Sequence, residues 1–146
     1  MKFTPISEAD AATAGLWPSK IYDFEVIESA DETSNAGNEM IKLNVAIFND
    51  EGKHRKIFDY LVASEKTQYK VRHFAAATGL LPLYEKGELR AEDCMHKTGR
   101  CQVRLEPAAK GYPAKNTIGD YVPVVAGAPL IASKAPEEMQ DDEIPF

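Results

Sequence analysis

Two stretches of the sequence interleave cationic and aromatic side chains, a combination that binds a polyanion carrying flat rings. The first stretch, residues 53–60, reads KHRKIFDY. The second, residues 97–115, carries five basic residues against a single acid, Glu106, and includes Tyr112. Cations neutralise phosphates and aromatic rings stack on bases, with each stack contributing about 1–3 kcal/mol. The pattern therefore indicates a surface for single-stranded nucleic acid.

The sequence offers little for catalysis. A phosphate-binding loop, a dinucleotide-binding glycine motif and a His-Glu-x-x-His metal motif are all missing. An enzyme, such as a nuclease or a nucleotide-processing accessory, would need a clustered acidic or metal site, and the sequence suggests none. We therefore expect a protein that is not an enzyme and needs no cofactor.

Cys94, His96 and Cys101 lie close enough in sequence to be considered as zinc ligands. A structural zinc site needs four ligands at short recurrent spacings, and no second pair is present. Cys101 also alternates with Val103 and Leu105, as a small core residue of a strand would. The sequence therefore predicts no metal site.

Alternating apolar residues predict five strands, at residues 20–28, 40–48, 53–61, 99–106 and 115–122. A polar loop, residues 29–38, joins the first two strands, and a tight turn containing Gly52 joins the next two. Residues 64–79 predict one amphipathic helix, with Ser64 as its N-cap and Gly79 as its stop. A short second helix or irregular chain follows before the fourth strand.

Three strands, a helix and two strands are the element order of a mainly β fold, the five-stranded OB-type barrel. This fold is an antiparallel Greek key whose α-helix lies between strands 3 and 4. A doubly wound α/β fold is disfavoured because only one crossover helix is convincing, and a β-sandwich remains the alternative.

In an OB barrel the second and third strands and the 1–2 and 4–5 loops line the ligand groove, and both enriched stretches map there. Tyr22 and Phe24 are expected in the core, whereas groove and core both remain open for Phe58 and Tyr60. The candidate DNA-binding residues are Lys42, Phe48, Arg55, Lys56, Phe58, Tyr60, Arg100, Arg104, Lys110, Tyr112 and Lys115.

The net charge of −6 is concentrated near the C-terminus. Residues 137–146 hold five acidic residues and no basic one, so residues 1–136 keep 17 basic and 18 acidic residues, a net charge of −1. The low isoelectric point therefore does not argue against a nucleic-acid partner. From residue 123 onward the Pro/Ala-rich and then acidic sequence predicts a disordered linker and tip.

The final six residues combine charge with apolar anchors: Asp141, Asp142, Glu143, Ile144, Pro145 and Phe146. Phe146 could fill a pocket on a partner protein while its α-carboxylate meets an Arg or Lys, with the acids steering the approach. An ordinary solvated tail, the alternative, needs no such ending. We therefore predict that these six residues bind a protein partner.

This ending, DDEIPF, is similar to the acidic tip of bacterial single-stranded DNA-binding proteins (SSB). The body, over roughly residues 19–122, resembles instead a family of phage-encoded single-stranded DNA-binding proteins. The residues that carry this resemblance are 38–43 (NEMIKL), 71–80 (VRHFAAATGL), 93–100, and 116–118 with Tyr121. The acidic first half, with Asp31 and Glu32 in a loop expected near the groove, departs from the pattern.

The resemblance implies an OB domain, residues 1–122, that coats single-stranded DNA in phage replication, recombination or repair. It also implies a tip that recruits host proteins that dock on SSB, with Pro145 and Phe146 in the partner's pocket and the acids against its basic rim. The alternative is an SSB mimic that occupies those host partners without coating DNA. Self-association on DNA stays open.

Location is expected to be the cytoplasm of a bacterial host. The N-terminal residues contain no hydrophobic signal segment, and no stretch approaches the roughly 18–20 apolar residues of a membrane helix. Two cysteines do not make a disulfide framework.

Overall fold

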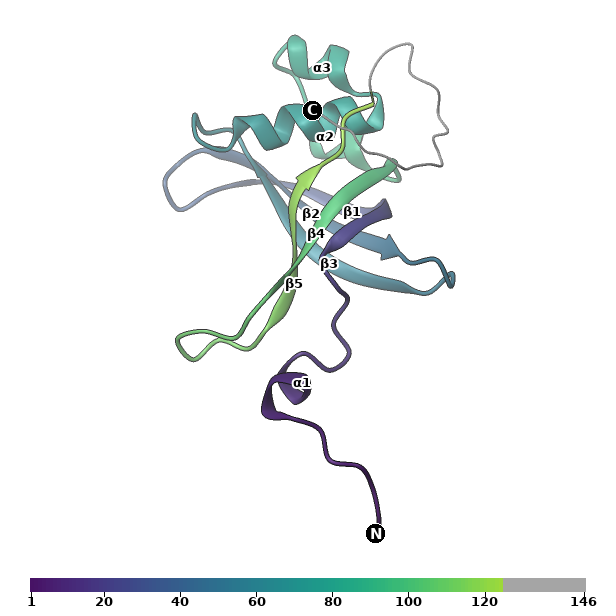
Figure 1. Ribbon diagram of the computed structural model, residues 1–146. Coiled ribbons are helices and arrows are strands. Elements are labelled where there is room, and N and C mark those ends of the chain that lie inside the picture. Colours follow the sequence, from purple (N-terminus) through teal and green to yellow (C-terminus); the bar gives the residue numbers. More distant parts are fainter. Residues whose placement is uncertain (125–146) are drawn as a thin grey trace.

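Five antiparallel strands build a nearly closed OB-type barrel in the computed structural model, which describes residues 1–124 (Figure 1). The strands are β1 (Lys20–Thr33), β2 (Glu39–Phe48), β3 (His54–Val62), β4 (Thr98–Glu106) and β5 (Lys115–Tyr121). Their order in the sheet is β3-β2-β1-β4-β5, and β3 contacts β5 to close the barrel. The mainly β class and the OB-type barrel are confirmed. The expected tip, together with the linker from residue 125, lies outside the described residues.

The first strand is longer than its sequence predicts. Residues 29–33 were expected to be a loop, but they pair with β2, so that Ala30 lies opposite Lys42 and Glu32 opposite Met40. A bulge between Val26 and Glu28 shifts the register at the start of this extension. Ladder hydrogen bonds here outweigh the weak strand propensity of a polar segment.

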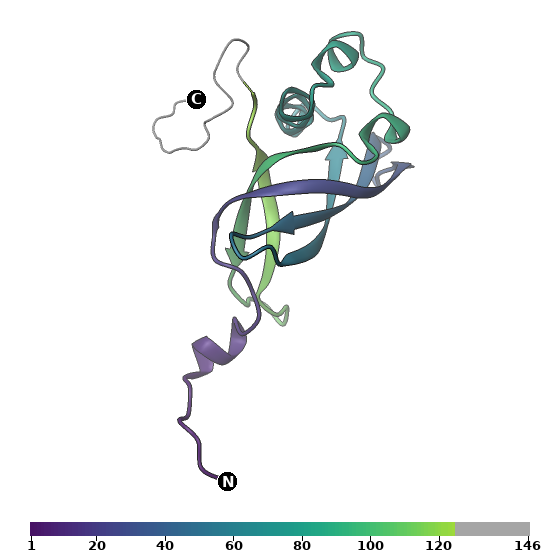
Figure 2. The same ribbon diagram turned by 90° about the vertical axis from the view of Figure 1, so that its right-hand side faces the viewer.

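Three helices occupy the connection from β3 to β4: α2 (Gln68–Thr78), α3 (Leu81–Glu85) and α4 (Ala91–Cys94). They lie over one end of the barrel (Figures 1 and 2). The predicted stop is confirmed, because Gly79 has φ 85° and ends α2. The predicted start is wrong, since α2 is preceded by Thr67 as its N-cap residue, and Ser64 instead belongs to the turn before it.

A short N-terminal helix, α1 (Glu8–Ala12), was not predicted. It contains no buried residue, and its N-cap Ser7 accepts a hydrogen bond from the Asp10 backbone N–H at 3.1 Å. The segment extends away from the barrel (Figure 1). No helix within residues 1–124 is long and apolar enough to cross a membrane.

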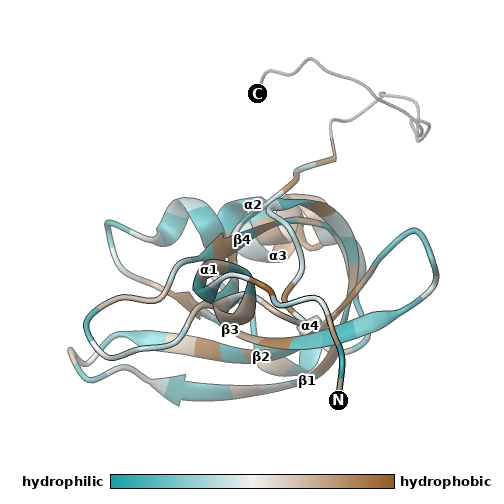
Figure 3. Cartoon of the chain, turned by 60° about the horizontal axis from the view of Figure 1, so that its bottom comes forward, coloured by the Kyte–Doolittle hydropathy of each residue, from teal (hydrophilic) through white to brown (hydrophobic). Residues whose placement is uncertain are grey.

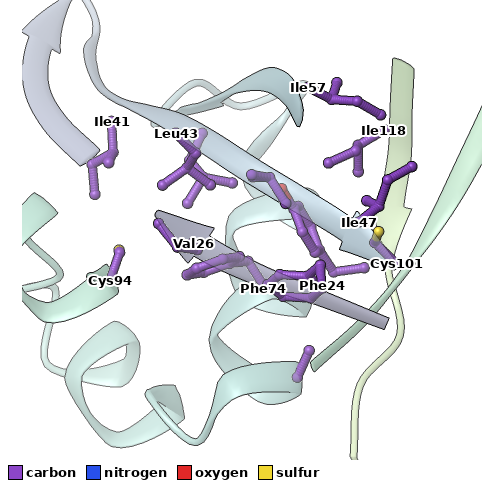
Figure 4. Packing of buried hydrophobic residues seen from close by; sticks show 14 of the residues in the cluster. Phe24, Val26, Ile41, Leu43, Ile47, Ile57, Phe74, Cys94, Cys101 and Ile118 are labelled. Carbon is purple, nitrogen blue, oxygen red and sulfur yellow. The ribbon is translucent and has the colours of Figure 1, made fainter. Parts of the chain in front are cut away.

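The core packs α2 onto the inner faces of the strands. Phe74 of α2 meets the Tyr121 ring edge-on at 5.0 Å between centroids, and Phe24 meets the same ring at 5.2 Å. Figure 4 shows Phe24 and Phe74 beside each other, with Cys101 nearby. Cys101 and Val103 are buried on the inner face of β4, as the alternation predicts.

The end of the barrel opposite α2 is held by a buried amide. Asn116 of β5 accepts a hydrogen bond from the Trp17 backbone N–H at 2.9 Å and donates to the Trp17 carbonyl oxygen at 2.8 Å. The Trp17 ring packs on Tyr22, with 5.2 Å between centroids. These contacts tie the segment before β1 to the barrel.

A buried ionic network joins α2 to both strands at the closure of the barrel. Lys70 Nζ donates to Asp59 Oδ1 at 2.7 Å and to the Ile118 carbonyl oxygen at 2.9 Å. Tyr121 donates its hydroxyl to Asp59 Oδ2 at 2.7 Å. Burial raises the pKa of the Asp59 carboxyl, while Lys70 opposes that rise.

We predict that Lys70→Met lowers the free energy of unfolding by about 3–5 kcal/mol at pH 7, because it leaves the Asp59 carboxylate buried without its cation. The variant should lose less at lower pH. Because the pKa of Asp59 is raised in the folded state, that state binds more protons than the unfolded state at pH values between the ordinary pKa of 3.8 and the folded-state pKa. Stability therefore falls as the pH rises through this interval. Removing Lys70 raises the folded-state pKa further, so the interval then extends to higher pH.

Urea denaturation at pH 5 and pH 7 measures both effects, with Lys66→Met as the matched control because Lys66 is exposed. This account of the network would be contradicted if Lys70→Met lost no more unfolding free energy than the control, or lost the same amount at the two pH values.

Candidate nucleic-acid interface

The outward sides of β2 and β3 form one surface, called here the β2–β3 face; Figure 3 shows these strands and β1 side by side. His54, Lys56, Phe58 and Tyr60 are exposed, whereas the alternating Ile57, Asp59 and Leu61 are buried. The predicted alternation of β3 is therefore confirmed. The outward pairs across the two strands are Phe48 with His54, Ala46 with Lys56, Asn44 with Phe58, and Lys42 with Tyr60.

Two aromatic rings on this face are available to a ligand. Phe58 is 59% exposed and Tyr60 is 43% exposed, so neither belongs to the core. Lys42 Nζ lies 4.9 Å from the centroid of the Phe58 ring, within cation–π range. The strand alternation thus brings together an exposed ring pair and a cation.

Arg55 lies apart from this group. Arg55 is two residues from the buried Ile57, so the two side chains leave β3 on the same side. Its Nη1 donates to the Gly15 carbonyl oxygen at 2.8 Å. Its guanidinium therefore holds the N-terminal segment instead of joining Lys56 and Phe58 on the β2–β3 face.

The predicted arginines of β4 lie further around the barrel. Arg100 is exposed and pairs across the strands with Asp23 of β1, which in turn pairs with Phe48. Two strand spacings, about 9–10 Å, thus separate Arg100 from Phe48. Arg104 covers Gly119 of β5 so closely that a side chain there would collide with the guanidinium.

The loop between β4 and β5 presents the remaining candidates. Lys110 and Gly111 both have positive φ, 48° and 83°, and the flanking Ala109 and Tyr112 exchange backbone hydrogen bonds. This is the geometry of a two-residue type I′ hairpin turn. Tyr112 is 73% exposed beside that turn, and Lys115 is exposed at the loop's base. This loop and the β1–β2 loop project on the same side of the barrel (Figure 1).

A hollow of about 410 Å³ adjoins the exposed Phe58 ring, and sequence reasoning missed most of its lining. The lining residues are Glu28, Ser29, Ala30, Glu32, Lys42, Asn44, Phe58 and Met95. The register places Glu28, Asn44 and Phe58 in one row across three strands. The alternation of β2 already puts Asn44 on the side of Lys42, a signal that could have identified it.

Asn44 carries an unsatisfied polar atom. Its Oδ1 is buried and accepts no hydrogen bond from any residue that the structure describes. A buried acceptor without a partner costs about 1–3 kcal/mol. The barrel therefore keeps a destabilising group at the hollow.

Acidic residues follow the outward side of β1 next to this hollow. Glu28 and Glu32 line the hollow itself, so carboxylates stand beside Lys42. Asp31, expected with Glu32 in a loop near the groove, is instead on the strand, and its Oδ1 accepts from the Ala91 backbone N–H at 3.0 Å. Phosphate is therefore disfavoured on the β1 side and favoured near Lys56 on β3.

The cysteines considered for zinc are both buried. Burial raises the pKa of the Cys94 and Cys101 thiols to about 12, and zinc binds the thiolate form. His96 has an exposed side chain, with Nδ1 3.7 Å from Glu25 Oε2. Within residues 1–124, no three His, Cys, Asp or Glu side chains gather as a metal site would require.

No protein-family model matches the chain, and no curated protein matches it. What the geometry offers is an exposed pair of rings with cations, next to a hollow whose lining is partly apolar and partly charged, with both glutamates and Lys42.

We predict that Asn44→Leu raises the free energy of unfolding by about 1 kcal/mol, because it removes a buried oxygen that has no partner. Asn116→Leu is the matched control and should instead destabilise, since Asn116 satisfies both backbone groups of Trp17. Urea denaturation of the two variants distinguishes the cases. An equal loss of unfolding free energy in the two variants would show that the Asn44 oxygen has a hydrogen-bond partner in the folded protein.

Proposed function

We propose that this chain is a non-enzymatic single-stranded DNA-binding protein of the phage type. Its barrel coats single strands without reading a defined sequence, and its C-terminal tip recruits host proteins that dock on bacterial SSB. The observation that carries the proposal is the pair of exposed rings, Phe58 and Tyr60, flanked by Lys42 and Lys56 on the β2–β3 face of an OB-type barrel.

Energetics favour this use of the surface. Each base stacked on Phe58 or Tyr60 contributes about 1–3 kcal/mol, and every base has a face to stack. Phosphates joined to those bases gain Lys42 and Lys56 as counterions. A strand held mainly by stacking and charge is bound whatever its sequence.

The loops support the same assignment. In OB barrels the 1–2 and 4–5 loops flank the groove over strands 2 and 3. Here Lys110 and Tyr112 belong to the exposed β4–β5 loop, and the exposed Lys115 begins β5 directly after it. They add one aromatic ring and two cations to those of the β2–β3 face. Replication, recombination and repair on phage DNA in the host cytoplasm follow from the family resemblance.

A second candidate is an SSB mimic whose tip occupies host partners while the barrel does not bind DNA. The carboxylates of Glu28 and Glu32 beside Lys42 favour it, because they weaken the attraction for a polyanion. Equal binding of the intact protein and an isolated tip peptide to a host SSB partner, with no DNA binding, would favour the mimic.

Phe58→Ala should weaken binding to labelled oligo-dT by about 5- to 150-fold, the equivalent of one lost base stack. Tyr69→Ala is the matched control, because Tyr69 is 53% exposed on α2, away from the β2–β3 face. Fluorescence anisotropy with an unlabelled duplex competitor measures both variants.

The same titration repeated over a salt series tests the cations. The log–log salt slope should be near −0.7 per neutralised phosphate, and Lys56→Gln should reduce its magnitude by about 0.7. A flat slope for the parent protein, or equal losses in Phe58→Ala and Tyr69→Ala, would exclude this surface as the DNA site.

Deletion of residues 137–146 should raise affinity for oligo-dT at low salt. Those residues carry five acidic side chains, which compete with DNA for the same cations. The gain should disappear at high salt because exposed charges are then screened. Unchanged affinity at low salt would contradict competition by the tip.

A further inference from the structure

We infer that the hollow beside Phe58 binds the N-terminal arm, residues 1–7, of a second copy of this chain, with Phe3 in the hollow and Lys2 at its acidic side. The contact links copies head to tail along one strand of DNA. Its role in coating DNA rests on the proposed function, but the contact between copies can be measured without DNA.

The arm carries large apolar side chains that face solvent. Phe3 is 71% exposed and Ile6 is 64% exposed. The chain that follows is fixed to the barrel, because Arg55 binds the Gly15 carbonyl oxygen and β5 holds the backbone of Trp17. The arm itself extends away from the barrel (Figures 1 and 2). Its apolar side chains therefore leave water only by packing against another surface.

The hollow combines an apolar wall with a negative rim. Phe58 is 59% exposed and Met95 is 37% exposed, so both offer apolar surface. Glu28 and Glu32 are exposed carboxylates in the same lining, and Lys42 lies over the Phe58 ring. A ligand that complements both parts has a large apolar side chain next to a cation.

The arm offers that combination, because the exposed Lys2 directly precedes Phe3. A hollow of about 410 Å³ is in the range of small-molecule pockets and admits an aromatic side chain. Burial of the Phe3 ring supplies most of the affinity, since exposed ion pairs contribute little. The charges instead orient the arm. The acidic Glu8 lies five residues further on, up to about 17 Å along an extended chain, and stays outside the hollow.

The base of the arm and the hollow lie at different levels of the barrel. Glu28 is eight residues along β1 from Lys20, a distance of about 25 Å, whereas the chain before Lys20 runs the other way (Figure 1). The arm of one copy therefore meets the hollow of the next copy. Such a contact uses two different surfaces, so it builds an open row of copies when the rotation does not close. An open row suits a strand that is coated along its length.

The arm and the DNA strand use different sides of Phe58. Phosphates are favoured near Lys56 on β3, and the carboxylates of β1 repel them. The arm takes the β1 side, where its Lys2 meets those carboxylates. Strand and arm thus occupy the β2–β3 face together.

The size of the contact decides when it forms. One Phe ring buries about 150–250 Å², far below the roughly 1,200–2,000 Å² of a stable interface. Two copies therefore stay apart in dilute solution. Copies bound to one strand are held at a high effective concentration, and there the contact forms and makes binding cooperative.

Oligo-dT of two lengths tests the cooperativity, one holding a single copy and one holding several. The readout is the ratio of affinity per copy for the long and the short oligonucleotide. Phe3→Ala should lower this ratio by about 10- to 150-fold, the equivalent of one buried Phe side chain. Lys2→Glu should lower it too, because it places an acid against Glu28 and Glu32. Tyr69→Ala, which removes an exposed ring outside the arm and the hollow, is the matched control and should leave the ratio unchanged.

Disulfide trapping identifies the surface that the arm binds. Phe3→Cys and Ala30→Cys are made in separate proteins and mixed at high concentration with a mild oxidant; Ala30 lines the hollow and is exposed. The native Cys94 and Cys101 are buried and do not compete. The mixture should give a disulfide-linked dimer. Phe3→Cys mixed with Ala108→Cys, an exposed position outside the hollow, should give much less.

Equal trapping at Ala30 and Ala108, or an affinity ratio that Phe3→Ala does not change, would overturn the docking of the arm and leave single-strand binding intact. A disulfide that forms only within one chain carrying both Phe3→Cys and Ala30→Cys would overturn the link between copies. Trapping at Ala30 without binding of either oligonucleotide would instead overturn the proposed function and leave the contact in place.

Discussion

The bridge from Lys70 through Asp59 to Tyr121 is the interaction on which the barrel depends. Among the described strands, backbone ladders run from β3 through β2, β1 and β4 to β5, but none joins β3 to β5. The bridge spans that seam and fixes α2 above it, which brings Phe74 onto the Tyr121 ring. It also sets the outer surface. Asp59 is anchored inward, so its neighbours in the strand, Phe58 and Tyr60, must point outward.

Charge divides the outer surface into two unlike halves. The β3 side carries Lys56 and the exposed rings, whereas the β1 side carries Glu28 and Glu32. A uniformly basic groove would hold phosphates anywhere along its width. In the proposed complex with single-stranded DNA, the acidic side would keep phosphates over β3. The carboxylates of β1, which weaken the attraction for a polyanion, would there orient the strand.

Local alternation was sufficient to predict which residues of β2 and β3 share a side, because a strand with one buried face repeats every two residues. It grouped Phe58 and Tyr60 with Lys56 but left open whether the two rings face the groove or the core, and their exposure in the folded chain decides that. The second half of β1 was missed because its polar residues are held in the sheet by pairing with β2, which no local pattern encodes. The row from Glu28 to Phe58 depends on the register of three strands and on a bulge, so it could be seen only in the folded chain.

The register across β4 decides where the chain enters and leaves the barrel. Both β1 and β5 are antiparallel to β4 between them, so they run the same way. Tyr22 of β1 and Tyr121 of β5 both pair with Cys101, so the start of β1 is nearly level with the end of β5. Because the two strands run the same way, the chain before Lys20 and the chain after Tyr121 leave this level in opposite directions. Segments attached at the two ends of the barrel are therefore directed away from each other although their points of attachment lie two strands apart.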